Sequence, residues 1–387
     1  MLRWTIKRQL LLWFLGCYFF LFFFKFSNLF AENNERKENN FQNTQEIISK
    51  NSNNSIKIRF IKDLLIKPDE NSEKTAFHFP GGVEADSKGN IYVLDPYNFR
   101  VQIFTSRGDY LKTIGRRGQG PGEFELPLYI NIDTLDNIYV FDMLRKTWVV
   151  FTSGGIFYKN IRADKNIIRV EKICIDSNQN IICGYVPIEG NFEVYKISRF
   201  DEKFNLLEDL YEKEGVLSFM RLQGGINIIP HRYTPKIIWT MGDDGIIYVS
   251  FNKTYEIEVL SGNGELIHKI TRKIQPEKIT QKEKNEVIGK LRQRFSNDII
   301  KQIDFPKMKP PIWHLYIVDN YLYVQKKILR KKNKFLFDMF EKTGRYVDEV
   351  ILDFQPMVYK NNFIYTIRPD FENLTADVIR YKIEKNS

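Results

Sequence analysis

Cysteine is scarce in this chain of 387 residues, which holds only Cys17, Cys174 and Cys183. So small a supply excludes the paired-cysteine motifs that bind structural zinc. Cys174 and Cys183 flank a predicted hairpin turn at residues 177–179, and a shift of one residue in strand register decides whether they face each other. The sequence therefore leaves two alternatives open, a small disulfide across the hairpin or two buried free thiols.

Two other chemical signatures are missing. No Gly-x-Ser-x-Gly nucleophile elbow occurs in the chain. The stretch GRRGQGPGEFELP at residues 115–127 is glycine-rich and basic, but it lacks the Lys-Ser/Thr pair and the following helix that a phosphate-binding loop needs. It lies between a predicted outer strand, 110–114, and a predicted inner strand, 129–133. We therefore interpret it as a joint of the scaffold.

The first thirty residues carry a targeting signal. Three basic residues within the first eight positions precede an apolar run over 10–24, which is the pattern of a secretory signal peptide. Leu29 makes the cleavage site at 28–31 a poor one, so an uncleaved signal anchor is the alternative; residues 14–17 bear only a faint likeness to a lipidation box. We predict a signal peptide or signal anchor over 1–31, with the protein exported to the periplasm, to the cell envelope or to a membrane outside the cytoplasm.

Residues 32–55 are rich in Asn, Glu and Lys and hold few apolar side chains. Such a segment cannot bury enough surface to offset the entropy lost on ordering, so we predict a disordered tether. The net charge of +10 favours anionic surroundings, such as membrane lipid, nucleic acid or acidic glycans. Because export argues against nucleic acid, the expected partner is a protein, peptide or glycan, with membrane association through the N-terminal segment. We expect the protein to be a monomer.

An internal repeat organises the rest of the chain. A shift of 47 residues lays 79–114 over 126–161 without a gap. The aligned identities are Pro80 with Pro127, Asp86 with Asp133, 90–93 with 137–140, Asp95 with Asp142, 104–106 with 151–153, Gly108 with Gly155 and Lys112 with Lys159. The same template recurs more weakly from about residues 174, 248, 323 and 363.

Each unit of the repeat is typical of four short β-strands, with a D-x-x-x-N turn after the inner strand and a glycine turn between the two outer strands. The sixth unit lacks its outermost strand, which a predicted strand over 56–66 can supply from the other end of the chain. Closing the ring in this way removes exposed sheet edges. We therefore predict an all-β fold over 56–387, a six-bladed β-propeller closed by an N-terminal strand.

The motifs of the first blade suggest a family. Residues 90–95 (NIYVLD), 98–104 (NFRVQIF) and the GQGPGEF stretch resemble the NHL-repeat signature, and the chain from about residue 56 is similar to bacterial exported six-bladed β-propeller proteins. The likeness is specific in blades 1 and 2 and degenerate from blade 3 onward. Blade 2 already departs from it, because Thr147 stands where Arg100 stands in blade 1, so an Asp–Arg pair within that blade is lost.

Two insertions interrupt the predicted ring. Residues 211–234 connect blades 3 and 4, and residues 276–305 connect blades 4 and 5. The second insertion alone has a helical pattern, with Thr280 as a candidate N-cap and an apolar stripe that includes Val287 and Leu291. This basic helix either packs on the propeller with its charged side in solvent or docks a partner or a membrane.

Three of the four histidines, His78, His231 and His314, precede the inner strands of blades 1, 4 and 5. Their entry loops should surround the mouth of the central channel, where imidazoles could hold zinc with an open position. A similar six-bladed family, the peptidyl-hydroxyglycine amidating lyases, uses zinc in that region, but its motifs do not match these positions. A lactonase-like calcium site would need channel carboxylates and amides, for which Glu84 and Asn131 are the candidates. Unrelated loop histidines are the alternative.

Basic residues cluster at Arg116-Arg117, at His231-Arg232, in the helical insertion and over 326–334. Propeller topology places these loops on one face, together with Trp313 beside His314. We predict ligand-binding residues on that face, with ordinary solvated loop charge as the alternative. The candidates are Arg116, Arg117, His78, His231, Arg232, Trp313 and His314.

We therefore predict an exported or tethered binding module of unknown ligand, without a cofactor. One alternative is a metal-dependent propeller enzyme, a lyase or lactonase with zinc or calcium at the channel mouth. The other is a purely structural protein of the cell envelope.

Overall fold

A computed structural model describes residues 44–48, 57–68, 72, 76–78, 80–164, 167–187, 194–214, 219–222, 225–228, 231–293, 295–301, 303, 305–329, 334–370 and 375–386. The predicted signal segment and most of the predicted tether lie outside these residues. Within the described part, no helix is long and apolar enough to cross a membrane.

Five antiparallel sheets of four strands follow one another along the chain. Blade 1 holds β3 (Gly82–Ala85), β4 (Ile91–Asp95), β5 (Arg100–Phe104) and β6 (Tyr110–Ile114), with a short 3-10 helix η1 (Pro96–Asn98). Blade 2 holds β7 (Pro127–Ile132), β8 (Ile138–Asp142), β9 (Thr147–Phe151) and β10 (Phe157–Arg162). Blade 3 holds β11 (Ile167–Ile175), β12 (Ile181–Pro187), β13 (Tyr195–Phe200) and β14 (Leu206–Lys213). Blade 4 holds β17 (Ile237–Met241), β18 (Ile247–Phe251), β19 (Glu256–Leu260) and β20 (Leu266–Thr271). Blade 5 holds β21 (His314–Val318), β22 (Tyr321–Leu329), β23 (Lys334–Glu341) and β24 (Tyr346–Leu352).

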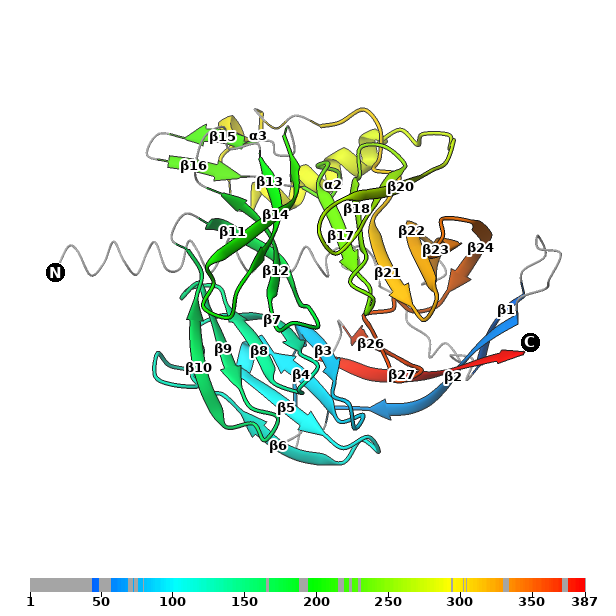
Figure 1. Ribbon diagram of the computed structural model, residues 1–387. Helices are drawn as coiled ribbons and strands as arrows, with labels where there is room; N and C mark the ends of the chain where they lie inside the picture. The colour runs from blue at the N-terminus through cyan, green and yellow to red at the C-terminus, as the bar shows by residue number, and fades with distance from the viewer. Residues whose placement is uncertain are drawn as a thin grey trace. The chain divides into compact units, whose positions relative to one another are not determined.

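The sixth sheet joins the two ends of the described chain. It runs in the order β1-β2-β27-β26-β25, from β25 (Val358–Lys360), β26 (Phe363–Asp370) and β27 (Thr375–Asn386) to the N-terminal strand β2 (Lys57–Ile66). The inner strands β3, β7 and β11 contact one another in order, as do β17, β21, β25 and β3, and a buried apolar cluster joins blades 3 and 4, so the ring of six blades is closed. Figure 1 shows the sheets following one another around a common centre. The predicted six-bladed propeller and its closure by an N-terminal strand are confirmed.

Strand β1 (Thr44–Ile48) lies within the predicted tether 32–55 and corrects the prediction of disorder for these five residues, while the rest of the tether lies outside the described residues. It pairs with β2 from Thr44 opposite Ile61 to Ile48 opposite Lys57. Gln45 fastens the strand to blade 5, because its side chain donates to the Ile351 carbonyl (3.1 Å) and accepts from the Asp353 amide (3.2 Å). The outer edge of β2 offers unpaired backbone groups, and satisfying them orders even a short polar strand.

The D-x-x-x-N motif forms a turn held by its own side chains. In blade 1, the Asp86 carboxylate accepts from the amides of Lys88 (2.9 Å) and Asn90 (2.8 Å) and from the Asn90 side chain (2.7 Å). Asp133 makes the same three bonds in blade 2. The turn residue before the asparagine has positive φ, which explains Gly89 in blade 1. These aspartates are turn formers, as predicted.

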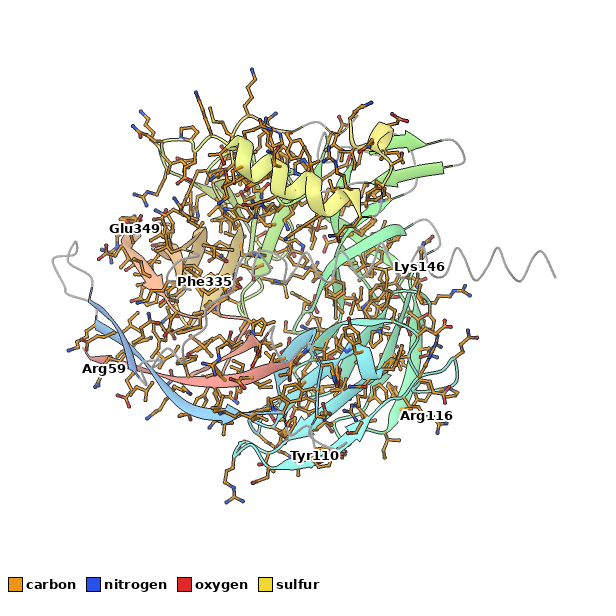
Figure 2. The ribbon with its side chains drawn as sticks, turned by 180° about the vertical axis from the view of Figure 1, so that it is seen from behind. Arg59, Tyr110, Arg116, Lys146, Phe335 and Glu349 are labelled. Atoms are coloured by element: carbon orange, nitrogen blue, oxygen red, sulfur yellow. The ribbon has the colours of Figure 1, made fainter. Side chains whose placement is uncertain are left out.

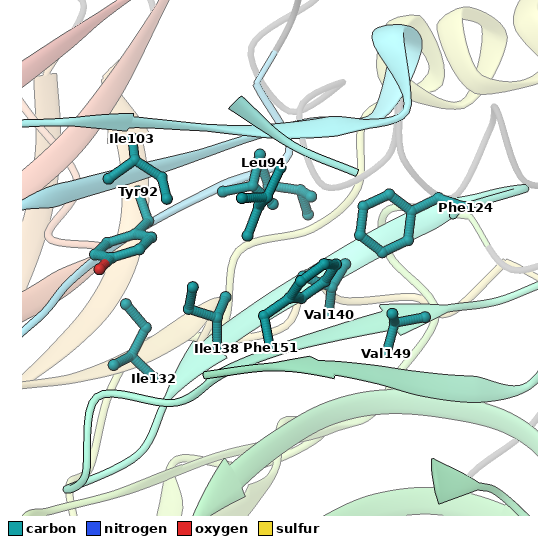
Figure 3. Close-up of a cluster of buried hydrophobic side chains, with 11 residues drawn as sticks. Tyr92, Leu94, Ile103, Phe124, Ile132, Ile138, Val140, Val149 and Phe151 are labelled. Carbon is teal, nitrogen blue, oxygen red and sulfur yellow. The ribbon is translucent and has the colours of Figure 1, made fainter. Parts of the chain in front are cut away.

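Apolar side chains at repeated positions pack one blade against the next. Figure 3 shows this core between blades 1 and 2, where Tyr92 and Ile103 of blade 1 lie over Ile132, Ile138 and other apolar residues of blade 2. Similar clusters join blade 3 to blade 4 and blade 4 to blade 5. Most of the aromatic residues thus serve the scaffold, because blade-to-blade burial is what stabilises a stack of repeats.

Strand register determines whether the two hairpin cysteines face each other. Cys174 lies opposite Ile182, and Cys183 lies opposite Ile173. Because successive side chains of a strand point to opposite faces, the two thiols lie on opposite faces of the sheet. Both cysteines are free, so the free-thiol alternative is the one that the structure adopts.

The insertion between blades 4 and 5 is helical, as predicted. It holds α2 (Gln281–Arg292) and α3 (Asn297–Ile300). Thr280 is the N-cap of α2 and forms a capping box with Glu283. The buried side chains of α2, Val287 and Leu291, lie one turn apart and belong to the predicted stripe. In the other insertion, β15 (Phe219–Leu222) and β16 (Gly225–Ile228) form a two-stranded hairpin.

Candidate functional site

The loops that lead into the inner strands share one face of the propeller, which we call the entry face. Loop 115–126 meets the connections between second and third strands there. The Arg117 guanidinium lies 5.2 Å from the ring centre of Phe99, and Arg145 donates to the Glu123 carbonyl (2.7 Å). The D-x-x-x-N turns and the turns between outer strands lie at the other ends of the strands, on what we call the turn face.

Second strands end in a carboxylate or an amide that braces an entry loop. Asp142 accepts from the amides of Glu125 (2.6 Å) and Leu126 (3.2 Å), and Asn252 accepts from the Lys236 amide (2.7 Å). Asp95 pairs with Arg100 (3.4 Å), and burial raises the pKa of Asp95. In blade 2, where Thr147 stands in place of the arginine, the Asp142 carboxylate accepts hydrogen bonds from backbone amides instead. The entry loops are therefore held at fixed positions by the sheets below them.

Loop 115–127 folds around Glu123 and Phe124. The Glu123 carboxylate accepts from the Gly120 amide (2.8 Å) and from Arg116 Nε (2.7 Å), and these contacts lower the pKa of Glu123. At Gly115, φ is +80° and a Cβ atom would lie 2.1 Å from the Phe124 ring. The Gly120 amide is already bonded to the Glu123 carboxylate and is therefore not available to a phosphate. The loop is a structural joint, and it displays Arg116, whose side chain is 81% exposed. Figure 2 labels Arg116 at the periphery of the ribbon.

Three predicted ligand residues, His231, Arg232 and Trp313, come together beneath the helical insertion. The His231 ring is 4% exposed, stacks on Phe305 at 4.4 Å, and accepts a hydrogen bond at Nδ1 from the Tyr233 amide. Tyr233 in turn packs edge-on against Trp313 at 6.2 Å. These contacts bury His231 in this part of the entry face, and the ligand-binding role of the three residues stays a prediction.

Arg232 joins the same covered cluster to α2. Its side chain is 6% exposed, forms an ion pair with Glu286 of α2 (3.1 Å), and lies 4.7 Å from the ring centre of Tyr233. The ion pair holds the insertion against the loop that leads into blade 4. The basic pair of residues 231 and 232 thus anchors the helix, whereas sequence reasoning treated it as a ligand site.

The other two candidate histidines have different contacts, although His314 directly follows Trp313 in the chain. His78 is exposed, and its backbone amide bonds to Asp95. His314 is the first residue of β21, opposite Gln325, and its ring lies 5.9 Å from that of Tyr316. Among the residues that the structure describes, no three His, Cys, Asp or Glu side chains form a group that could hold a metal ion. The zinc and calcium alternatives remain predictions.

The remaining basic groups divide into paired and outward-facing ones. In the basic run 326–334, Lys326 pairs with Asp338 (2.9 Å) and Lys327 pairs with Glu277 (2.7 Å), while residues 330–333 lie outside the described chain. On α2, the acidic groups face inward to partners. The exposed positions of the helix are Gln281, Lys282, Asn285, Gly289 and Arg292, and Glu277, Lys278 and the N-cap Thr280 are exposed just before it. The outer side of α2 is therefore cationic.

A mostly polar level of the inner strands was largely missed by sequence reasoning. Strand register places six inner-strand residues at one level, each opposite the repeated Tyr or Ile of the second strand. We call this level the channel layer; it consists of Glu84, Asn131, Cys174, Thr240, Tyr316 and Val358. Sequence reasoning singled out only Glu84 and Asn131. Reading the same repeat position in the other blades would have found the rest.

Glu84 interacts across the channel. Its carboxyl group interacts electrostatically with Lys172 of blade 3 and Asp243 of blade 4. Because neither blade is a neighbour of blade 1, these interactions pass across the channel. Burial raises the pKa of Glu84 to about 8, against the opposing influence of Lys360 and Lys172. The side chain is surrounded by protein yet keeps partial access to the channel. It is the most perturbed carboxyl group that the structure describes.

Lys172 and Lys360 stand beside the channel layer. Lys172 directs its ammonium toward the Trp239 carbonyl (3.4 Å) and the Thr240 hydroxyl (3.3 Å), both on blade 4. Lys360 ends β25 in blade 6, three blades from Lys172 in either direction around the ring. Two lysines on opposite blades thus both act electrostatically on the Glu84 carboxyl group.

Comparison with known proteins agrees with this architecture. Residues 33–366 match the model of the family DUF5128, described as a 6-bladed beta-propeller. No protein with a curated description matches the chain. A solved Bacteroides fragilis protein, whose name suggests export, is similar over 91% of this chain and 98% of its own, with 11% identity and a TM-score of 0.54.

Two further solved structures are similar at lower TM-scores. A member of the duf4221 family from Bacteroides vulgatus is 11% identical over 85% of this chain and 99% of its own, with a TM-score of 0.47. An inactive variant of virginiamycin B lyase from Staphylococcus aureus is 13% identical over 84% of this chain and 99% of its own, with a TM-score of 0.41. Since the family model matches most of the residues in the chain, the protein belongs to the DUF5128 family of six-bladed β-propellers.

Proposed function

We propose that this propeller is a binding module that holds an anionic peptide or glycan on its entry face. The observation that carries the proposal is the construction of loop 115–127. Arg116 is 81% exposed, yet its loop is fixed by Glu123 and by the buried Phe124 ring. A guanidinium group displayed on a fixed loop binds carboxylate or sulfate groups at a low entropic cost.

A second group of cations supports the same proposal. Arg117 lies beside Arg116, and the outer side of α2 adds Lys278, Lys282 and Arg292. The burial of His231 and Arg232 beneath α2 moves the candidate surface outward, from the channel mouth to the exposed loop and helix. An extended polyanion suits such a surface better than a compact ligand, because its charges can meet separate clusters along the face.

The proposal also places the propeller outside the cytoplasm. Its support is the basic and apolar pattern of residues 1–31, together with a similar protein whose name suggests export. Fractionating cells and measuring the intact mass of the protein tests this point. We expect the protein in the envelope or membrane fraction, either at full mass or lacking about thirty residues. Recovery of the full-length chain in the soluble cytoplasmic fraction would contradict it.

The entry face can be tested with variants of matched charge. We expect the wild-type protein to be retained on immobilised heparin and on poly-glutamate. The double variant Arg116→Ala/Arg117→Ala should elute at a lower salt concentration, because it loses two outward charges. The control is Arg107→Glu, which changes the net charge by the same amount in the β5–β6 turn on the turn face, where Arg107 is 87% exposed.

Two outcomes would contradict the proposal. Equal shifts for the double variant and the control would show that net charge alone sets retention. A wild-type protein that neither matrix retains at physiological salt would favour the structural alternative, especially if a protein partner co-purified with it.

A further inference from the structure

The channel layer carries chemistry that the entry face does not use. Five of its six residues are polar: a carboxyl, an amide, a thiol, a hydroxyl and a phenol, from five different blades. Lys172 and Lys360 each lie two residues from the layer on opposite blades, and both act electrostatically on Glu84. We propose that the channel layer, together with Lys172 and Lys360, binds one small anion that bears a carboxylate or phosphate group. This site is separate from the proposed entry-face surface and stands or falls independently of it.

The arrangement of the lysines is the first argument. A Lys ammonium group has three N–H donors, and Lys172 directs them at two acceptors that lie at the long end of the hydrogen-bond range, 3.3 and 3.4 Å. Its ammonium also lies 5.3 Å from the ring centre of Trp239. The contacts with blade 4 thus orient the Lys172 ammonium group and leave it able to donate to a further acceptor. An anion between Lys172 and Lys360 would face both cations in a setting where water screens charge poorly.

The state of Glu84 is the second argument. Because burial holds its pKa at about 8, most of this carboxyl group is protonated at pH 7. A neutral carboxyl group donates a hydrogen bond through its O–H, and an ionised one would repel the anion. At pH 7 the layer and its two flanking lysines therefore offer an excess of positive charge, opposed by Asp243 at the turn face.

Cation binding fits the same residues poorly. The two lysines contribute positive charge, and the described residues near Glu84 supply no second or third acid group within a metal-binding cluster. Calcium and magnesium prefer several oxygen ligands with net negative charge. The donor set of ammonium, carboxyl O–H, hydroxyl and amide groups matches the oxygens of a carboxylate or a phosphate instead.

The pH dependence follows from the sign of the Glu84 shift. As the pH rises through about 8, Glu84 ionises and adds a negative charge beside the bound anion. Four groups face this carboxyl group: Lys360 of β25, Lys172 and Cys174 of β11, and Asp243 after β17. If only the protonated form binds, the apparent affinity falls about tenfold between pH 7 and pH 9.

Titration calorimetry with sulfate and with acetate tests the site, since both probes keep their charge between pH 7 and pH 9. Sulfate stands for the phosphate source of the ligand and acetate for the carboxylate source. We expect saturable binding of at least one probe by the wild-type protein at pH 7, about tenfold weaker at pH 9. Glu84→Gln should bind at pH 7 and lose this pH dependence, because the amide still donates but no longer ionises.

Lysine variants and an entry-face control complete the test. Lys172→Met and Lys360→Met should each weaken binding tenfold or more, whereas Arg116→Ala/Arg117→Ala should leave it unchanged. Should Lys172→Met fail to fold, Lys360→Met at the end of its strand carries the test alone. The proposal is overturned if the wild-type protein binds neither probe, if Glu84→Gln keeps the pH dependence, or if the entry-face variant abolishes binding while the channel variants do not.

Discussion

The most direct consequence of the covered cluster concerns the anchoring of α2. Glu286→Gln removes the carboxylate that pairs with Arg232, whose side chain is only 6% exposed. Two unit charges 3.1 Å apart attract by about 5 kcal/mol at an effective dielectric constant of about 20. Glu286 is 28% exposed, so regained hydration returns part of that energy, and we expect a net loss of about 2 kcal/mol in the anchoring of the helix.

Hydrogen exchange measures this loss locally. A change of about 2 kcal/mol raises the opening equilibrium of α2 about 25-fold, at 1.4 kcal/mol for each factor of ten. The matched control is Asp298→Asn in the same insertion, because the Asp298–Lys301 pair is 88% and 77% exposed and should contribute little. Unchanged exchange in Glu286→Gln, or an equal change in the control, would refute the conclusion that the cluster anchors the helix.

Two further predictions concern the scaffold. Gly115→Ala places a Cβ atom 2.1 Å from the Phe124 ring at a φ of +80°, so urea unfolding should show that the free energy of unfolding falls by at least about 2 kcal/mol. In the control Gly289→Ala, on open helix surface, it should rise by about 0.5–1 kcal/mol. Equal stability of the two variants would contradict the fold of the loop. A chain that starts at residue 67 lacks β2 and its pairing with β27, so it should show no cooperative thermal transition. A chain that starts at residue 51 keeps β2 and should unfold cooperatively. The same melting curve for both chains would contradict closure of the ring by β2.

The repeat made most of the fold predictable. Each blade reuses the same local chemistry, so matching Asp86 with Asp133 also located the turns, the strands between them and the six-fold ring. Strand β1 could not be found in this way, because it lies outside the repeat and its order comes from the β2 edge and from the contacts of Gln45 with blade 5. Local composition does not report an edge supplied by a distant segment.

The candidate site was less predictable than the fold. Topology placed His231, Arg232 and Trp313 near one another, but it could not show that the insertion would cover them. That outcome depends on Phe305 and Glu286, and Glu286 lies 54 residues along the chain from its partner Arg232. The perturbation of Glu84 has a similar origin, since it arises from burial and from charges on blades that come together only when the ring closes.

The central claim, that the entry face binds an anionic ligand, is tested most directly by a hydrogen-exchange footprint of the wild-type protein with a saturating heparin oligosaccharide. We expect protection confined to the loop 115–127 and to α2, with no change at the turns 86–90 and 105–109. Protection centred on those turns, or no protection at a saturating concentration of the heparin oligosaccharide, would contradict binding at the entry face.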